Sequence, residues 1–231
     1  MTGDIRHTAL IEIDIQNDFC PAYASLSGEK YPDGALAVRG GNDVIEPLNR
    51  LARVFAARGA RVIATQDWHP ADHVSFASAH PGRKAGELID TAELKDQMLW
   101  PDHCVQGKNG AAFHERLDLE CVSLIIRKGF RQNLDSYSAF YENDRKTPTG
   151  LSAFLKGLGI ETVALGGLAT DYCVFYSAMD AVKEGYKTIV LLDACRGVGY
   201  PEGSVEKALD DMKQAGVILA NSPELSTGFS A

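Results

Sequence analysis

Six short runs of mostly aliphatic residues, rich in β-branched side chains, recur along the chain and predict β-strands. Most of these runs contain hardly any polar residue, which is typical of parallel strands that are covered on both faces. The predicted strands are residues 8–14, 61–66, 121–127, 162–167, 187–194 and 216–221.

Amphipathic stretches lie between these runs and predict helices. In residues 43–58, the apolar side chains Leu48, Leu51, Ala52 and Phe55 recur at the spacing of one helix face. Similar patterns occupy residues 150–158, 171–185 and 202–215. Strands that alternate with helices form a doubly wound α/β fold. We therefore expect a mostly parallel six-stranded sheet with helices on both faces, as in Rossmann-like proteins.

Three connections are too long to be plain turns between neighbouring elements. Residues 15–42, 68–120 and 129–149 contain proline, glycine and charged residues but little sustained periodicity. Loops of more than about 12–15 residues are usually functional or disordered. Because the chain has no internal repeat and no low-complexity linker, we expect a single domain over residues 1–231.

The composition of the chain indicates what class of protein it is and which partners are disfavoured. Its 231 residues are 45% hydrophobic and 23% charged, which is ordinary for a soluble globular protein. The formal net charge of −8, with no basic run, disfavours nucleic acid and anionic membrane as partners. Five cysteines at irregular spacing, no long apolar segment and no secretion signal at the start favour a reducing, cytoplasmic location.

Reactive side chains stand at the carboxyl ends of four predicted strands. Asp14 ends the first strand, Asp67 and His69 follow the second, Lys128 follows the third, and Cys173 comes shortly after the fourth. Ligands of open α/β sheets bind beyond these strand ends. Each residue alone could be structural, as a solvated aspartate, a surface lysine or a packed cysteine. Their convergence from separate strands nevertheless predicts one active site.

The acid, the amine and the thiol suit nucleophilic catalysis. A thiolate is favoured beside a cation and at the start of a helix, so Lys128 and the helix dipole would activate Cys173, with Thr170 or Asp171 as the helix cap. Asp14 could take the thiol proton and return it to a leaving amine. Backbone N–H groups of the same turn could hold an oxyanion.

The stretch DWHPADH contains candidate metal ligands. In an extended segment, side chains two positions apart point to the same side, so Asp67 and His69 converge, and Pro70 keeps His69 extended. His73 follows in a turn, and His103 is a distant further ligand. One carboxylate and two imidazoles suit Zn²⁺, Fe²⁺ or Mn²⁺. The alternative is that Asp67 and His69 form a hydrogen-bonded pair in a polar loop.

Five segments of the chain carry a resemblance to a known family. They are DIQNDFC (14–20), DWHPADH (67–73), WPDHCVQG (100–107), KG (128–129) and GLATDYCV (167–174). Through these segments, and over about residues 8–221, the chain resembles the nicotinamidase (pyrazinamidase) branch of the isochorismatase-like cysteine hydrolases. No single segment is specific, but the combination is.

The resemblance implies a catalytic triad beside a metal. By motif position, the triad comprises Asp14, Lys128 and Cys173. The implied ligand set comprises Asp67, His69, His103 and, as in only some members of the family, His73. The cofactor implied is one divalent transition metal, with zinc as the first candidate and iron or manganese as the others.

The resemblance also implies how the substrate is held. The N–H groups of Ala169 and Cys173 would bind the oxyanion, after a cis peptide bond between Leu168 and Ala169. The positions matched to substrate contact are Phe19, Gln16, Trp100, Tyr137 and Tyr172. Some relatives have histidine where this chain has Tyr172, a difference that affects the fine shape of the pocket.

The activity implied is hydrolysis of nicotinamide to nicotinate and ammonia through a thioester, within NAD salvage, with pyrazinamide as a further substrate. The ring nitrogen of nicotinamide would bind the metal and so place the carboxamide over Cys173. The main alternative is a related cysteine amidohydrolase of this fold that acts on another amide or a carbamoyl compound. A non-catalytic metal-binding protein and an isochorismatase fit the residues less well. The expected partner is the small-molecule substrate, and a homo-oligomer is left open.

Neither the predicted fold nor the predicted site explains Glu12. Glu12 lies two positions before Asp14 and shares its face of the strand. A carboxylate within a central strand is costly unless it is paired. The sequence does not indicate its partner.

Overall fold

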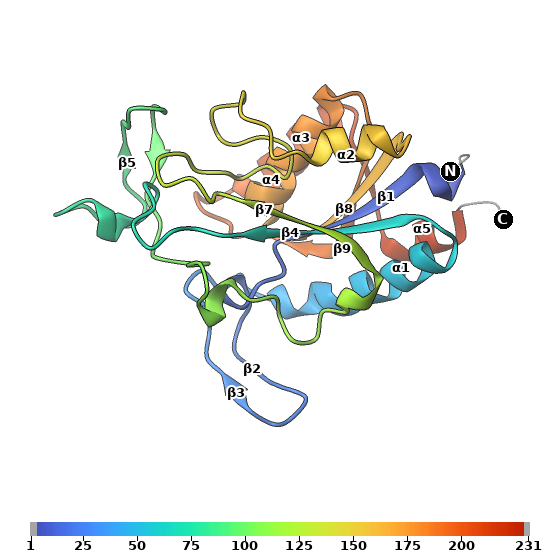
Figure 1. Cartoon of the computed structure of the whole chain (residues 1–231), viewed down its shortest axis with the longest axis horizontal. Coiled ribbons are helices and arrows are strands. Elements are labelled where there is room, and N and C mark those ends of the chain that lie inside the picture. The colour runs from blue at the N-terminus through green and yellow to red at the C-terminus, as the bar shows by residue number, and fades with distance from the viewer. Residues whose placement is uncertain (1–3, 229–231) are drawn as a thin grey trace.

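A parallel six-stranded sheet forms the centre of the molecule (Figure 1). The structure, a computed structural model, describes residues 4–228. The strands are β1 (Thr8–Ile13), β4 (Arg61–Asp67), β7 (Val122–Lys128), β8 (Thr162–Leu168), β9 (Lys187–Arg196) and β10 (Ile218–Ala220). Their order is β10-β9-β8-β1-β4-β7, and every neighbouring pair is parallel. The predicted fold class is confirmed.

Helices cover both faces of this sheet (Figure 1). One face carries α1 (Ile45–Ala57) and α5 (Ser222–Gly228). The other face carries α2 (Leu151–Gly157), α3 (Phe175–Lys183) and α4 (Ser204–Gln214). The doubly wound arrangement is therefore confirmed, although the sequence pattern did not predict α5.

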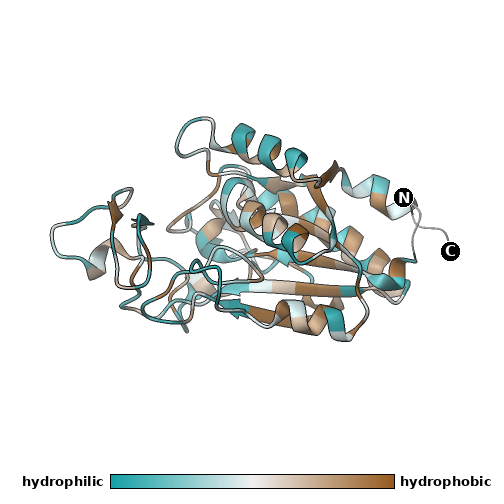
Figure 2. Cartoon of the chain, turned by 90° about the horizontal axis from the view of Figure 1, so that it is seen from above, coloured by the Kyte–Doolittle hydropathy of each residue, from teal (hydrophilic) through white to brown (hydrophobic). Residues whose placement is uncertain are grey.

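Alternate residues of β1 supply the two apolar cores. Leu10 packs in a cluster with Leu48 and Phe55 of α1, whereas Ile11 packs in a second cluster with Leu155 of α2. Every residue of β1 is buried. Figure 2 shows hydrophobic residues along much of the strands, and hydrophilic residues on the outer sides of the helices. The central strand β1 is thus packed from both sides, and this packing fixes the position of its carboxyl end.

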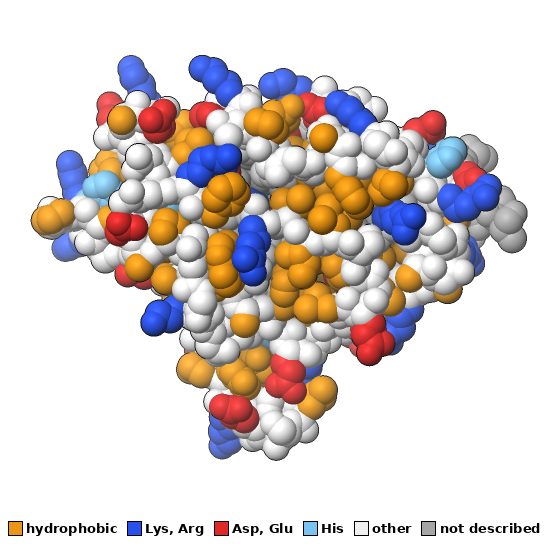
Figure 3. Space-filling view, in the orientation of Figure 1, with side chains coloured by type: hydrophobic (Ala, Val, Ile, Leu, Met, Phe, Trp, Pro, Cys, Tyr) orange, Lys and Arg blue, Asp and Glu red, His pale blue; other side chains and the backbone are white. Residues whose placement is uncertain are grey.

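The edge strand β7 differs from the strand that the sequence predicted. Within residues 4–228 it pairs only with β4, and half-buried and exposed residues alternate along most of its length. Ile125 is 44% exposed. Figure 3 shows hydrophobic side chains gathered in the middle of the face that it displays. The apolar run over residues 121–127 therefore forms a partly covered edge and is not buried on both faces.

The long connections contain two small antiparallel hairpins. They are β2 (Tyr23–Ala24) with β3 (Lys30–Tyr31), and β5 (Leu88–Ile89) with β6 (Gln97–Met98). Backbone hydrogen bonds order other parts of these connections, such as the one from the Val38 N–H to the Phe19 oxygen at 3.0 Å. The long connections are therefore ordered by small hairpins and backbone hydrogen bonds.

Two findings bear on the predicted compartment. No helix within residues 4–228 combines the length and the apolar character that crossing a bilayer requires. All five cysteines are free thiols, which confirms that they form no disulfide framework. The cytoplasmic location stays a prediction.

Glu12 is buried in β1 without a partner. Its side chain is fully covered, and neither carboxyl oxygen has a hydrogen-bond partner among the described residues. Burial, with a smaller contribution from the charge of Asp118, raises the pKa of Glu12 to about 8. The group is therefore neutral in the folded protein at lower pH, which reduces the cost of burying it.

We expect Glu12 to make the protein less stable as the pH rises. The folded state holds this proton up to a pH of about 8, whereas the ordinary pKa of the group is 4.5. Between these values the folded state binds one proton more than the unfolded state. The free energy of unfolding therefore falls by about 1.4 kcal/mol per pH unit from this group alone. Glu12→Gln cannot titrate and should gain stability relative to the wild type from about pH 5 to about pH 8.

Urea unfolding followed by circular dichroism across this pH range measures the effect. Glu202→Gln is the matched control, because Glu202 is exposed. Stability curves of the wild type and Glu12→Gln that run parallel with pH would contradict the assignment of a neutral Glu12.

Candidate active site

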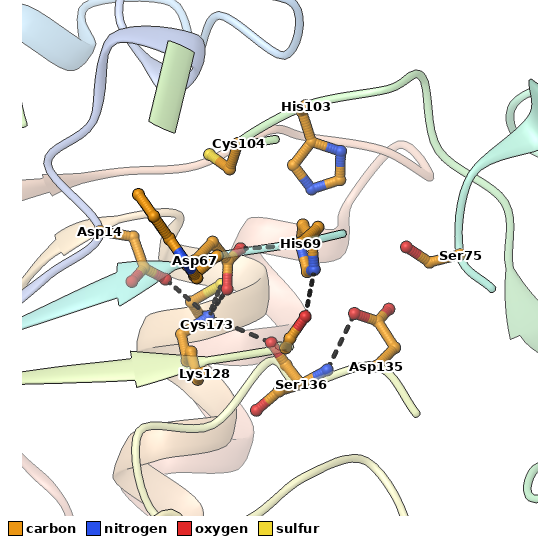
Figure 4. A network of polar contacts seen from close by, with 12 residues as sticks. Asp14, Asp67, His69, Ser75, His103, Cys104, Lys128, Asp135, Ser136 and Cys173 are labelled. Carbon is orange, nitrogen blue, oxygen red and sulfur yellow. Dashed lines mark hydrogen bonds and ion pairs between the residues drawn. The ribbon is translucent and has the colours of Figure 1, made fainter. Parts of the chain in front are cut away.

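Strand ends bring the predicted catalytic groups together at one edge of the sheet (Figure 4). Asp14 directly follows β1, Asp67 ends β4, and Lys128 ends β7. Cys173 lies in a π-helical turn, Thr170–Val174, between β8 and α3. All four side chains are buried. Because β8, β1, β4 and β7 are consecutive in the sheet, residues far apart in the sequence meet at this edge.

Lys128 is the centre of this polar network. Its ammonium lies 2.8 Å from Oδ2 of Asp14 and 3.6 Å from Sγ of Cys173. It also forms an ion pair with Asp67 and donates to the backbone oxygen of Ser136 at 3.1 Å. A fully buried ammonium needs such compensation. Lys128 therefore holds both carboxylates and the thiol in one cluster.

The cluster sets the resting protonation of its groups. Burial by itself lowers the pKa of Lys128, but the carboxylates of Asp14 and Asp67 outweigh it and raise this pKa well above its usual value. Burial raises the pKa of the Cys173 thiol well above its usual value, although Lys128 opposes the shift. Burial likewise raises the pKa of Asp14 against the effect of Lys128. Burial thus opposes the effect of the Lys128 charge on the thiol, and a neighbouring base such as Asp14 would help the thiol to lose its proton.

The backbone before the thiol has the form that the resemblance implies. The peptide bond between Leu168 and Ala169 is cis. The Val174 N–H donates to the Ala169 oxygen at 3.1 Å, the spacing of a π-helix. Ala169 and Cys173 line the same cavity. That the N–H groups of Ala169 and Cys173 bind the oxyanion stays a prediction.

The predicted helix cap is wrong. The residue before the π-helical turn is Ala169, and no side chain caps this turn. The Asp171 carboxylate instead accepts hydrogen bonds from the N–H groups of Val198 and Gly199, at 2.8 and 2.9 Å. Thr170 is buried within the turn. Asp171 thus ties the segment after β9 to the turn that carries the thiol.

Asp67, His69 and His103 form a buried group of metal-ligand side chains. One ligand atom from each lies within 4.8 Å of the others. Nδ1 of His69 lies 2.8 Å from the Gly129 backbone oxygen, and Nδ1 of His103 lies 2.7 Å from that of Pro101. Since a carbonyl only accepts, the neutral rings carry their protons on Nδ1 and keep Nε2 free for a metal. Nε2 of His69 is 3.6 Å from Oδ2 of Asp67. The donors therefore fit a divalent metal.

His73 lies beside this group in a different environment. The centre of its ring is 4.2 Å from that of His69. Its Nδ1 lies 2.7 Å from the Ser75 hydroxyl, and its Nε2 lies 3.3 Å from the Leu134 backbone oxygen. His69, His73 and Asp135 form a second buried group of possible ligands. Sequence reasoning missed Asp135, because it is a single acid in an irregular loop and no motif marks it.

A cavity of about 290 Å³ reaches the thiol. Its aromatic lining residues are Phe19, Trp100, Tyr137 and Tyr172, all four of which the sequence had indicated. Nε1 of Trp100 donates to the Tyr137 hydroxyl at 3.0 Å. The cavity also touches Asp67, His103 and Cys173. Sequence reasoning missed the aliphatic lining residues Leu36, Val38 and Val198, because nothing distinguishes them from other loop residues.

Gln16 is not among the residues that line this cavity, and its predicted contact with the substrate stays a prediction. Its side chain is fully buried. The side-chain nitrogen donates to the backbone oxygens of Asp67 and Ala111 at 2.8 and 2.9 Å, and the side-chain oxygen accepts from the Asp67 N–H at 2.8 Å. Gln16 therefore fixes the backbone of Asp67, a candidate metal ligand.

Known proteins share this fold and these motifs. The family model described as the isochorismatase domain matches residues 8–224. A nicotinamidase of Acinetobacter baylyi is 45% identical over 214 residues, which cover 92% of this chain and 91% of that protein. A solved nicotinamidase/pyrazinamidase structure from Acinetobacter baumanii has a TM-score of 0.85 at 44% identity, covering 95% of this chain and 98% of the other. The pyrazinamidase of Pyrococcus horikoshii in complex with zinc has a TM-score of 0.71 at 34% identity, covering 93% and 99%. The chain therefore belongs to the isochorismatase family and, within it, groups with the nicotinamidases.

Proposed function

We propose that the protein hydrolyses nicotinamide to nicotinate and ammonia. The observation that carries the proposal is that one cavity touches both Cys173, backed by Asp14 and Lys128, and the possible metal ligands Asp67 and His103. The first set suits amide hydrolysis, and the second suits an amide whose ring contains a basic nitrogen. The similarity to nicotinamidases supports the same substrate.

The proposed reaction begins at the thiol. One Asp14 carboxylate oxygen lies within 4.8 Å of Sγ of Cys173, so Asp14 takes the thiol proton as the sulfur attacks the carboxamide carbon. Lys128, which keeps its own proton, stabilises the negative charge that develops 3.6 Å away on the sulfur. The carbonyl oxygen becomes an oxyanion, for which we propose the N–H groups of Ala169 and Cys173 as donors.

Asp14 serves as acid and then again as base. When the tetrahedral intermediate collapses, the C–N bond breaks and Asp14 protonates the nitrogen, which leaves as ammonia. A thioester remains on Cys173. Asp14 next takes a proton from a water molecule as that water attacks the thioester carbon. The second collapse breaks the C–S bond, and Asp14 returns the proton to sulfur. The product leaves as nicotinic acid, which gives its proton to solvent to become nicotinate, so one water is consumed and the residues end as they began.

We propose that Asp67, His69 and His103 hold one divalent transition metal. The two imidazoles and the carboxylate favour zinc, with iron and manganese as the competing ions, and the similarity to a zinc-bound pyrazinamidase supports zinc. When bound, the metal supplies a Lewis-acid anchor for the ring nitrogen of the substrate. The carbonyls of Gly129 and Pro101 orient the two imidazoles for this role.

The aromatic side chains that line the cavity are the proposed contacts of the substrate ring. Phe19, Trp100, Tyr137 and Tyr172 offer flat apolar surfaces to a pyridine ring. The hydrogen bond between Trp100 and Tyr137 holds two of these side chains in place. Pyrazinamide has the same ring size and also a nitrogen meta to the carboxamide, so we propose it as a second substrate.

Ammonia release by the purified protein tests this function. Nicotinamide and pyrazinamide should be hydrolysed, whereas benzamide, which lacks the ring nitrogen, should be a poor substrate. Faster ammonia release from an N-carbamoyl amino acid than from nicotinamide would favour the alternative, a related amidohydrolase of the same fold.

We propose further that residues 1–231 form one domain, since within residues 4–228 the six strands β1, β4, β7, β8, β9 and β10 belong to one sheet between two apolar cores. Nicotinate from this reaction would enter NAD salvage. The oligomeric state stays a prediction.

A further inference from the structure

Asp14 has an unusual backbone that one neighbouring side chain supports. Its φ of 50° lies in the left-handed region, which non-glycine residues seldom adopt. Thr65 lies beside it in the neighbouring strand β4 and is fully buried. The Asp14 N–H donates to Oγ1 of Thr65 at 3.1 Å. The threonine hydroxyl thus supplies the hydrogen-bond partner for this strained position.

The same hydroxyl also holds the Asp14 carboxylate. Oγ1 of Thr65 lies 2.6 Å from Oδ1 of Asp14. A hydroxyl has one proton, and an ionised carboxylate can only accept, so the Thr65 proton points to Oδ1. The two hydrogen bonds close a ring between one side chain and the backbone and carboxylate of Asp14. Rotation of the carboxylate would break the second bond.

The two carboxylate oxygens therefore have different tasks. Oδ1 accepts the hydrogen bond from Thr65 at 2.6 Å, whereas Oδ2 forms the ion pair with Lys128 at 2.8 Å. We infer that Thr65 is a positioning residue that holds Asp14 so that Oδ2 exchanges the proton with Cys173. This inference rests on the proposed hydrolysis and deepens it.

Thr65 acts without touching the substrate. It is fully buried, and the residues that line the cavity of about 290 Å³ do not include it. Loss of its hydroxyl should therefore slow the proton transfers and leave substrate binding unchanged. A split between kcat and KM distinguishes this role from a general loosening of the pocket.

Thr65→Val keeps the branched shape and removes the hydroxyl, whereas Thr65→Ser keeps the hydroxyl. With nicotinamide as substrate, kcat of Thr65→Val should fall by about 10- to 100-fold, the effect of losing one hydrogen bond to a charged group, while KM stays within about twofold. Thr65→Ser should recover most of kcat. Thr188→Val is the control, because it removes another buried hydroxyl, which bonds the Tyr186 oxygen near the amino end of β9.

Three outcomes would overturn the inference: a kcat of folded Thr65→Val within twofold of the wild type, a rise in KM at constant kcat, or a Thr65→Ser variant as slow as Thr65→Val. If Thr65→Val does not fold, Thr65→Ala, which has no methyl groups to press on Asp14, takes its place with the same expectations. A wild-type protein that releases no ammonia from nicotinamide would refute the proposed function itself. Normal wild-type activity with an unaffected Thr65→Val would refute only the role of Thr65.

Discussion

Cys173→Ala should abolish ammonia release from nicotinamide while the protein still folds. In the proposed mechanism the thiol is the nucleophile, so its removal closes the covalent route and should lower kcat by several orders of magnitude. Alanine is smaller than cysteine and fits in the same space. The ion pair between Lys128 and Asp14 does not involve the sulfur and should remain. A steady-state ammonia assay measures the loss, and thermal unfolding followed by circular dichroism shows whether the fold is retained.

Cys121→Ala is the matched control for this result. Cys121 lies just before the amino end of β7, whereas Lys128, which lies beside the Cys173 thiol, is at the carboxyl end of the same strand. Its replacement should leave kcat near the wild-type value. Near-normal turnover by folded Cys173→Ala would exclude the thioester mechanism, and an equal loss in Cys121→Ala would show that the assay reports damage to the fold.

His69→Ala should lose most of the bound metal. It leaves two of the three ligand side chains in the group formed by Asp67, His69 and His103. Changes beyond the direct ligands typically cost about 10–100-fold in metal affinity or activity, and loss of a direct ligand should exceed that. Metal content measured by mass spectrometry after dialysis gives the occupancy, and KM for nicotinamide should rise as the metal is lost.

His73→Ala is the matched comparison, and it should reduce occupancy only modestly. Its imidazole lies tilted beside that of His69, with its nitrogens near the Ser75 hydroxyl and the Leu134 oxygen, and it does not belong to the first ligand group. Stoichiometric metal in His69→Ala, or full activity in exhaustively chelated protein, would mean that DWHPADH is a polar loop without a metal.

The positions of the catalytic groups could be predicted because parallel strands all point the same way. Once residues 8–14 and 61–66 were read as strands, Asp14 and Asp67 had to lie at the same edge of the sheet. Lys128 followed in the same way from the strand before it. Hydrophobic patterning depends on local sequence, and it was sufficient for this part of the site.

Several contacts could not be predicted, because they join segments that only the folded chain brings together. Gln16 bonds the backbone at Asp67, 51 residues away. Asp171 binds backbone N–H groups 27 and 28 residues further along the chain, and not its own helix. A polar side chain forms hydrogen bonds with the groups that tertiary packing brings next to it. The local sequence pattern does not indicate which groups these are.

The sequence by itself determined the class of fold, the edge of the sheet where the site lies, and the residue types that meet there. Tertiary structure alone decided the environment of each group. Burial raises the pKa of the Cys173 thiol, and the folded chain places Thr65 at Oδ1 of Asp14 and Lys128 at Oδ2. The physical reason is that strand and helix patterns follow from the apolar spacing of near neighbours, whereas protonation and hydrogen-bond partners depend on desolvation and on atoms from distant segments.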